Sequence, residues 1–147
     1  MDLITALGDI GFAAALCLSA VGSALGTGIA GMASIGAWKK CYLEQKKIPF
    51  IIIAYVGAPL SQTIYGMILM NAILASSTTA SPATRFGVGI FGGLAMGASA
   101  WLQGKAAAGA ADAFTEAERG FANYIIILGI VETVALFVMV FLMTALK

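Results

Sequence analysis

One acidic residue stands far from every other charge in the chain. Glu132 lies near the middle of a long apolar stretch, and the nearest charged residues along the sequence are Arg119 and Lys147. A carboxylate deep in an apolar segment is costly unless it takes a proton or binds a cation, and such residues commonly form ion or proton sites. A structural role, as a buried hydrogen-bonding group, is the alternative. Glu132 is therefore the first candidate for a functional residue, as an ion or proton site.

A second apolar stretch carries polar groups that suit such a carboxylate. Four residues spaced i, i+3, i+4 and i+7 share one face of a helix: Ala58, Ser61, Gln62 and Tyr65. Pro59 has no N–H, so it leaves the carbonyl of Tyr55 without its helical partner and bends the helix. Irregular backbone of this kind often coordinates an ion. Buried hydroxyl and amide groups also need partners, so we expect this face to lie beside Glu132.

Gln103, in a third apolar stretch, is a further deep amide. Together these groups would surround Glu132 with oxygen atoms, a ligand set that suits a hard cation. Hydrogen bonding between helices is the alternative, because small polar residues often serve that purpose in membranes. For Ser61 alone the two interpretations are equal. The two glutamines and Tyr65, taken jointly with Glu132, favour the ion site.

The composition restricts the class of protein. Hydrophobic residues make up 61% of the 147 residues, charged residues only 10%, and the mean hydropathy is +0.98. A soluble domain has about a quarter of its residues charged, so a soluble globular enzyme and a disordered tail are excluded. A net charge of +1 provides no basic surface for nucleic acid. The chain also has no histidine, the commonest general base and metal ligand.

Four apolar stretches predict an all-α membrane protein with four transmembrane helices, since a bilayer core takes about 20 apolar residues per helix. The predicted helices cover about 11–38, 48–75, 86–111 and 121–146. Asp2 and Asp9 stand where a signal peptide would be basic, so we expect a retained first helix. Cys17 and Cys41 are about 36 Å apart along a helix, too far for a disulfide.

The sequence repeats itself once. Ser23, Ala24, Gly28 and Ala30 recur 76 positions later as Ser99, Ala100, Gly104 and Ala106, and Ile51–Ile53 recurs 74 positions later as Ile125–Ile127. We therefore divide the chain into two hairpins of the same orientation, 1–80 and 81–147. Most of the 18 glycines fall in the first and third helices, where small residues every three or four positions allow close packing. These helices should form an inner layer, with the second and fourth outside.

The basic residues predict the orientation. Four lysines lie at 39, 40, 46 and 47, Arg119 marks the third link, and the second link holds only Arg85. Because cytoplasmic loops carry the excess of basic residues, we assign loops 39–47 and 112–120 to the cytoplasm and both termini to the outside. Lys105 lies about two turns inside the third helix, from where its long stem can reach the headgroups.

Two patterns resemble nucleotide-binding motifs. Gly26–Gly31 fits G-x-G-x-x-G, but it lies within an apolar helix and not after a strand, which favours helix packing. Gly104-Lys105 resembles the end of a P-loop, but Ser99 stands where that motif needs glycine and Ala106 where it needs Ser or Thr. We predict no nucleotide site.

These features resemble the proteolipid of V-type and A-type rotary ATPases, which forms the rotor ring of those complexes. The residues 58–66, together with Gln103 and Glu132, look like those of the sodium-pumping bacterial branch. The resemblance implies that Glu132 binds Na+, or H+ in a proton-carrying ring, and that Tyr65 closes the site with a hydrogen bond. The further Na+ ligands that it implies are the side chains of Ser61, Gln62 and Gln103 and the backbone carbonyl of Ala58.

The same resemblance implies the surroundings of the chain. It would be a non-hydrolytic subunit of the cell membrane that forms a ring of identical copies. A stator subunit would provide two half-channels for the ion, and a central stalk would dock on the cytoplasmic loops. Ala58 occupies the repeat position of Glu132, so each chain would carry one ion.

Two rival classes remain. A small multidrug/proton antiporter also uses one membrane glutamate, but it would carry it in an early helix and would not need a parallel duplication. A purely structural four-helix protein would leave Glu132 unexplained.

Overall fold

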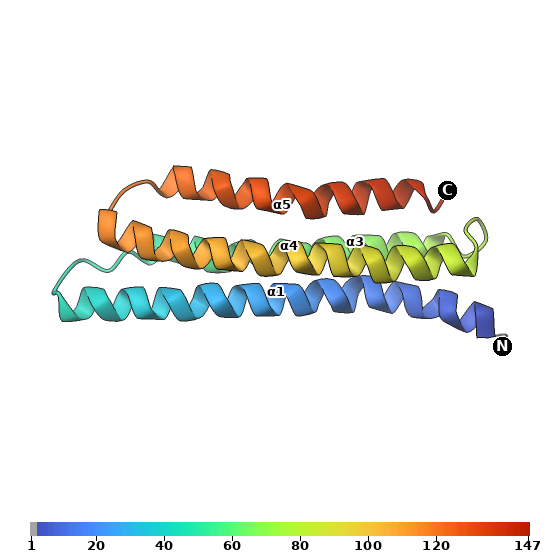
Figure 1. The fold of residues 1–147 in the computed structure, drawn as a ribbon, viewed down its shortest axis with the longest axis horizontal. Helices are drawn as coiled ribbons and strands as arrows, with labels where there is room; N and C mark the ends of the chain where they lie inside the picture. Colours follow the sequence, from blue (N-terminus) through green and yellow to red (C-terminus); the bar gives the residue numbers. More distant parts are fainter. Residues whose placement is uncertain (1–2) are drawn as a thin grey trace.

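The computed structural model describes residues 3–147 as long helices that run along one axis (Figure 1). The elements are α1 (Leu3–Leu43), η1 (Phe50–Ile52), α2 (Ile53–Gly57), η2 (Ala58–Leu60), α3 (Ser61–Ala75), α4 (Pro82–Ala117) and α5 (Phe121–Thr144). Elements η1 to α3 form one continuous rod, so four rods result, each long and apolar enough to span a membrane. Residues 3–147 contain no strand. The prediction of an all-α protein with four transmembrane helices is confirmed; Asp2 lies outside the described residues.

The second span is interrupted at Pro59. This buried residue lies in the 3-10 turn η2, between α2 and α3. Because proline has no N–H, the α-helical bonding is broken there. The chain tightens instead, and the N–H of Ser61 donates to the carbonyl of Ala58. The irregular backbone predicted from Pro59 is therefore present where the polar face of this span begins.

The helices extend beyond the apolar stretches that predicted them. α1 covers Leu3–Leu43 where 11–38 was expected, and α4 covers Pro82–Ala117 where 86–111 was expected. The apolar stretch reflects the thickness of the lipid, whereas flanking polar residues continue the helix outside it. Ser81 caps α4, since its Oγ accepts the N–H of Thr84 at 3.1 Å. Assigning Arg85 to the second loop was wrong: it lies in α4 and is buried.

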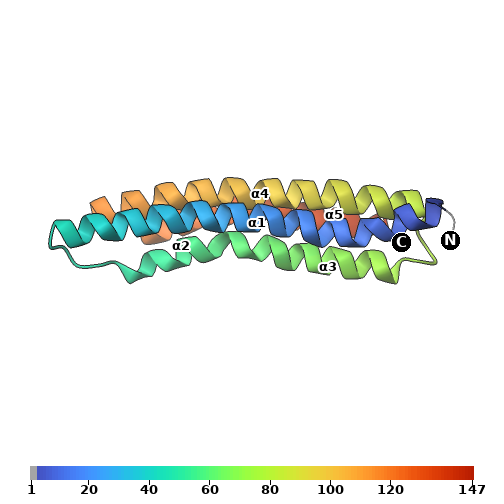
Figure 2. The same ribbon diagram turned by 90° about the horizontal axis from the view of Figure 1, so that it is seen from below.

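α1 and α4 lie against each other in both views of the ribbon (Figures 1 and 2). Their contact is made by pairs of glycines. A Cβ added at Gly22 would overlap the backbone of Gly97. The same holds for Gly89 against Gly11 and for Gly104 against Gly26. Such small residues let two helix backbones approach closely in lipid, where van der Waals packing drives association. The first and third helices thus pair as their glycine content predicts.

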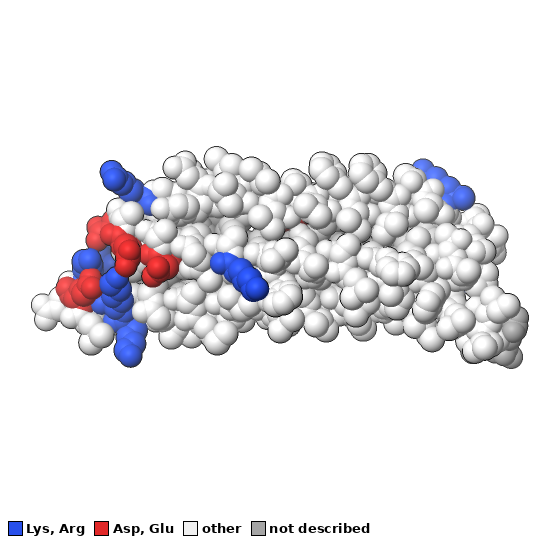
Figure 3. All heavy atoms as spheres, in the orientation of Figure 1, with Lys and Arg blue, Asp and Glu red and all other residues white. Residues whose placement is uncertain are grey.

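The two ends of the molecule differ in charge. Both termini and the link between α3 and α4 lie at one end, and the links 44–49 and 118–120 lie at the other (Figure 1). Most acidic and basic side chains gather at the second end (Figure 3). Both cysteines are free, as predicted. The assignment of the charged end to the cytoplasm stays a prediction.

Candidate functional site

Glu132 lies at the middle of α5 and is partly buried against α3 and α4. Its Oε1 accepts a hydrogen bond of 2.6 Å from the hydroxyl of Tyr65, and its Oε2 accepts one of 3.2 Å from Nε2 of Gln103. Hydrogen bonds to a carboxylate are among the stronger ones in proteins. The carboxylate of Glu132 is therefore held by hydrogen-bond donors from α3 and α4.

The two glutamines join this carboxylate to the second span. Nε2 of Gln62 donates to Oε1 of Gln103 at 2.8 Å, and both side chains are fully buried. Nε2 of Gln103 also donates to the carbonyl of Leu128 at 3.0 Å. Leu128 lies one turn before Glu132, so Gln103 contacts α5 at two points. The amide of Gln103 is thereby held with its oxygen toward Gln62 and its nitrogen toward Glu132.

Ser61 completes the chain of polar groups. Its Oγ lies 3.1 Å from the carbonyl oxygen of Ala58 and 3.2 Å from Oε1 of Gln62. The hydroxyl has a single proton, so it donates to one of these acceptors at a time. Ala58 belongs to the 3-10 turn at Pro59, which explains why its carbonyl is turned to this side chain.

All six residues predicted for the site are connected through these contacts. Their oxygen atoms are one carboxylate, two amide oxygens, two hydroxyls and one backbone carbonyl, which are ligands for a hard cation. Within residues 3–147 there is no cluster of three or more His, Cys, Asp or Glu side chains, the groups that hold most transition metals. A single carboxylate balances the charge of one proton or one monovalent cation.

Apolar clusters lie on both sides of the polar layer that Gln62, Gln103 and Glu132 form. One contains Leu69, Met96 and Met139, toward the termini. The other contains Tyr55 and Leu128, toward the charged end. In the second span, α4 and α5 the polar residue of the site lies between residues of these two clusters. Apolar side chains therefore cover the site toward both ends of the molecule. Electrostatic interactions strengthen in such a low-dielectric environment.

One residue of this region was missed by the sequence analysis. The hydroxyl of Ser99 donates to the carbonyl of Val131 at 3.0 Å and so ties α4 to α5 directly beside Glu132. Ser99 stands one helical turn before Gln103, on the same face, and this spacing could have revealed it.

The two motif-like patterns make other contacts. Gly26, in the G-x-G-x-x-G pattern, packs against α4, as helix packing predicts. Lys105 lies over the ring of Trp101, with its Nζ 4.3 Å from the ring centroid, a cation–π contact.

A protein-family model matches part of the chain. Residues 86–145 match the family model of the C subunit of ATP synthase. The matched segment is the second hairpin, and it includes Gln103 and Glu132. No curated protein sequence matches the chain.

The match covers less than half of the chain and lies within its last two spans. Members of this ATP synthase family are non-catalytic membrane proteolipids that form homo-oligomeric rings beside a stator. The second hairpin is thus similar to this family, and the four apolar helices indicate a multi-pass membrane protein.

Proposed function

We propose that this chain is the rotor-ring proteolipid of a V-type rotary ATPase and that it carries Na+ across the membrane on Glu132. ATP hydrolysis in a soluble head would drive the rotation. The observation that carries the proposal is the lone carboxylate at mid-helix, held by Tyr65 and Gln103 between two apolar clusters. Ala58 stands at the repeat position in the first hairpin and cannot ionise, so each chain carries one ion.

The oxygen atoms that are linked to Glu132 through Gln62 and Gln103 support Na+ in preference to H+. A protonated carboxyl group needs only one acceptor, whereas a metal cation needs several oxygen ligands. Ser61 brings a hydroxyl within 3.2 Å of the amide oxygen of Gln62 and 3.1 Å of the carbonyl oxygen of Ala58. Rotation of the Gln103 amide by half a turn would break its bonds to Gln62 and to the carbonyl of Leu128 and would turn its oxygen toward Glu132 as a further ligand.

The mechanism follows from charge neutrality. An unpaired carboxylate facing lipid costs about 2.5–3.5 kcal/mol on insertion scales, so Glu132 crosses the lipid only with its cation. The ion loads from the cytoplasm through one half-channel of a stator subunit and leaves through an offset second one. The hydroxyl of Tyr65 holds the loaded carboxylate in place between these events.

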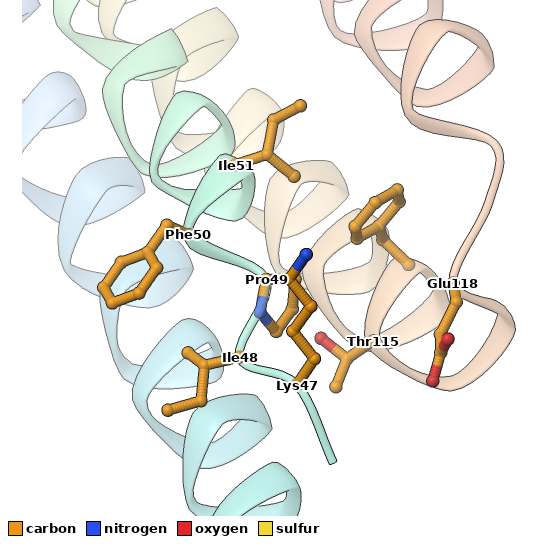
Figure 4. A pocket seen from close by; sticks show the side chains of 8 residues that line it. Lys47, Ile48, Pro49, Phe50, Ile51, Thr115 and Glu118 are labelled. Atoms are coloured by element: carbon orange, nitrogen blue, oxygen red, sulfur yellow. The ribbon is translucent and has the colours of Figure 1, made fainter.

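The central stalk would dock at the charged end, on loops 39–47 and 112–120. A cavity of about 440 Å³ opens there between the start of the second span and the end of α4 (Figure 4). Its lining combines apolar groups with Lys47 and Glu118, which suits an apolar side chain flanked by charges. A hydrogen bond from Lys46 lowers the pKa of Glu44, so this pair keeps both charges at neutral pH.

Transport by the complete ATPase in lipid vesicles tests the proposal. We expect ATP-driven uptake of radioactive Na+ that persists when a protonophore is added. Glu132→Gln should abolish the uptake. Thr133→Val should retain it, because within residues 3–147 the hydroxyl of Thr133 bonds only to the carbonyl of Ile130, in its own helix. Wild-type uptake in the Glu132→Gln variant would refute the site. ATP-driven proton uptake without Na+ uptake would instead refute the choice of ion.

A further inference from the structure

The terminal amide of Gln103 has only one orientation that its neighbours allow. The end of this amide lies 3.0 Å from the carbonyl oxygen of Leu128 and 3.2 Å from Oε2 of Glu132. A backbone carbonyl accepts hydrogen bonds but cannot donate them, and the same holds for an ionised carboxylate. The atom that faces both must therefore be the nitrogen of Gln103, and its oxygen faces away from Glu132.

This orientation determines that of Gln62. The oxygen of Gln103 accepts a hydrogen bond of 2.8 Å from Nε2 of Gln62. The oxygen of Gln62 is then turned the other way, 3.2 Å from the hydroxyl of Ser61. Both glutamines consequently point their N–H groups in the direction of Glu132, and the oxygen of each has a hydrogen-bond donor beside it.

A cation on Glu132 needs the opposite direction. Metal cations bind oxygen ligands, whereas an N–H group turns its positive end toward the ion. The direction seen here thus suits the free carboxylate, because Gln103 donates to it. A half-turn of the last side-chain torsion exchanges nitrogen and oxygen, and this torsion has a broad two-fold preference in glutamine. Loading of a cation therefore favours the reversed amide.

The two amides must rotate together. If Gln103 rotated alone, its nitrogen would face the nitrogen of Gln62, and two donors would meet with no acceptor between them. Both side chains are fully buried, and a buried donor without an acceptor is costly. Rotation of both amides restores the hydrogen bond between them in the opposite direction. Ser61 allows this, because a hydroxyl can either donate to the oxygen of Gln62 or accept from its nitrogen.

The reversed direction is unfavourable without a cation. The oxygen of Gln103 would then meet the carbonyl oxygen of Leu128 and the carboxylate of Glu132, so that three acceptors come together without a donor. Such a group becomes favourable when a hard cation lies among the three oxygens. The direction of both amides is therefore coupled to the presence of the ion.

We propose that binding of Na+ reverses the amides of Gln62 and Gln103 together. Gln62 is then a positioning residue for Gln103 as well as a ligand. This inference rests on the proposed Na+ transport and adds a coupled rearrangement to its ligand set. Release of the ion returns both amides to the direction in which Gln103 donates to Glu132, so the carboxylate is stabilised with and without its cation.

Infrared difference spectroscopy of the purified ring tests the reversal. The chain contains three glutamines. Gln45→Asn removes the one outside the site, at an exposed position with a φ of 54°, which asparagine tolerates. This ring is made with glutamine that is isotopically labelled at the side-chain carbonyl carbon. Exchange of choline for Na+ at fixed pH should shift the labelled bands of both glutamines, with the same half-maximal Na+ concentration. Gln62→Leu leaves only the labelled band of Gln103 and so assigns the two.

Binding of radioactive Na+ to the same ring separates this inference from the proposed function. Saturable binding with a shift in both labelled bands supports the paired reversal. Saturable binding with no shift, or with a shift in one band only, would overturn it. A ring without saturable binding would refute the proposed Na+ function itself. In the control Glu132→Leu neither band should shift, and a shift that persists there would show that the amides do not respond to an ion on Glu132.

Discussion

The hydrogen bond between Tyr65 and Glu132 makes a quantitative prediction. Tyr65→Phe removes the hydroxyl that lies 2.6 Å from the carboxylate and keeps the ring, which packs beside the cluster containing Leu69 and Met139. The bond from Gln103 remains. A hydrogen bond to a charged group contributes about 1.5–3 kcal/mol. The carboxylate binds the cation in its charged form, so the loss weakens Na+ binding by roughly 10- to 100-fold.

The assay is modification of Glu132 by a carbodiimide on the purified ring. The reagent attacks the protonated carboxyl group, so bound Na+ should slow the reaction at fixed pH. The measured quantity is the Na+ concentration that halves the rate, which should rise by the factor given above in Tyr65→Phe. Tyr55→Phe is the matched control, since that hydroxyl is buried in the same span without a hydrogen-bond partner among the described residues. An unchanged half-protecting concentration in Tyr65→Phe would show that the hydroxyl does not hold the occupied site.

Three further predictions concern the ligand set and the helix contact. In the unmodified ring, Na+ should protect Glu132 from the carbodiimide, and equal rates with Na+ and with choline would favour a proton-carrying ring. Gln103→Leu should raise the half-protecting Na+ concentration more than tenfold, because it removes hydrogen bonds to α3 and α5. The control Ser99→Ala loses one hydrogen bond to a backbone carbonyl and so about 1 kcal/mol of stability, without the same rise in the half-protecting Na+ concentration. Gly89→Ala should destabilise the ring by about 1–3 kcal/mol, because the new Cβ overlaps α1. Gly36→Ala should not destabilise it, because no atom lies within 4 Å of its added Cβ. Equal thermal stability of the two variants would contradict this packing.

Much of the site follows from helical spacing alone. The separation of Ala58, Ser61, Gln62 and Tyr65 assigns them to one face whatever the neighbours are. The isolation of Glu132 in α5 depends only on the positions of charged residues along the chain. Their connection with Gln103 then follows because buried polar groups must find partners. The roles of these residues as ion ligands stay predictions.

Other features depend on the register between helices, which single-helix spacing does not contain. The ion pairs of Asp9 with Arg85 and of Lys40 with Glu116 arise because α1 and α4 pack in parallel at the repeat offset. The sequence reveals that offset, but not that equivalent positions face each other. The helix ends were misjudged for another reason. Hydropathy measures the lipid-facing length, while caps such as Ser81 decide where a helix begins.

Equilibrium binding of radioactive Na+ to the purified ring tests directly whether Glu132 binds the ion. We expect one Na+ per chain in the unmodified ring, because Glu132 is the lone carboxylate at this depth and Ala58 stands at its repeat position. Glu132→Gln should reduce this value to the background of empty detergent micelles. Absence of saturable binding in the unmodified ring, or undiminished binding in the Glu132→Gln ring, would show that Glu132 is not a Na+ site.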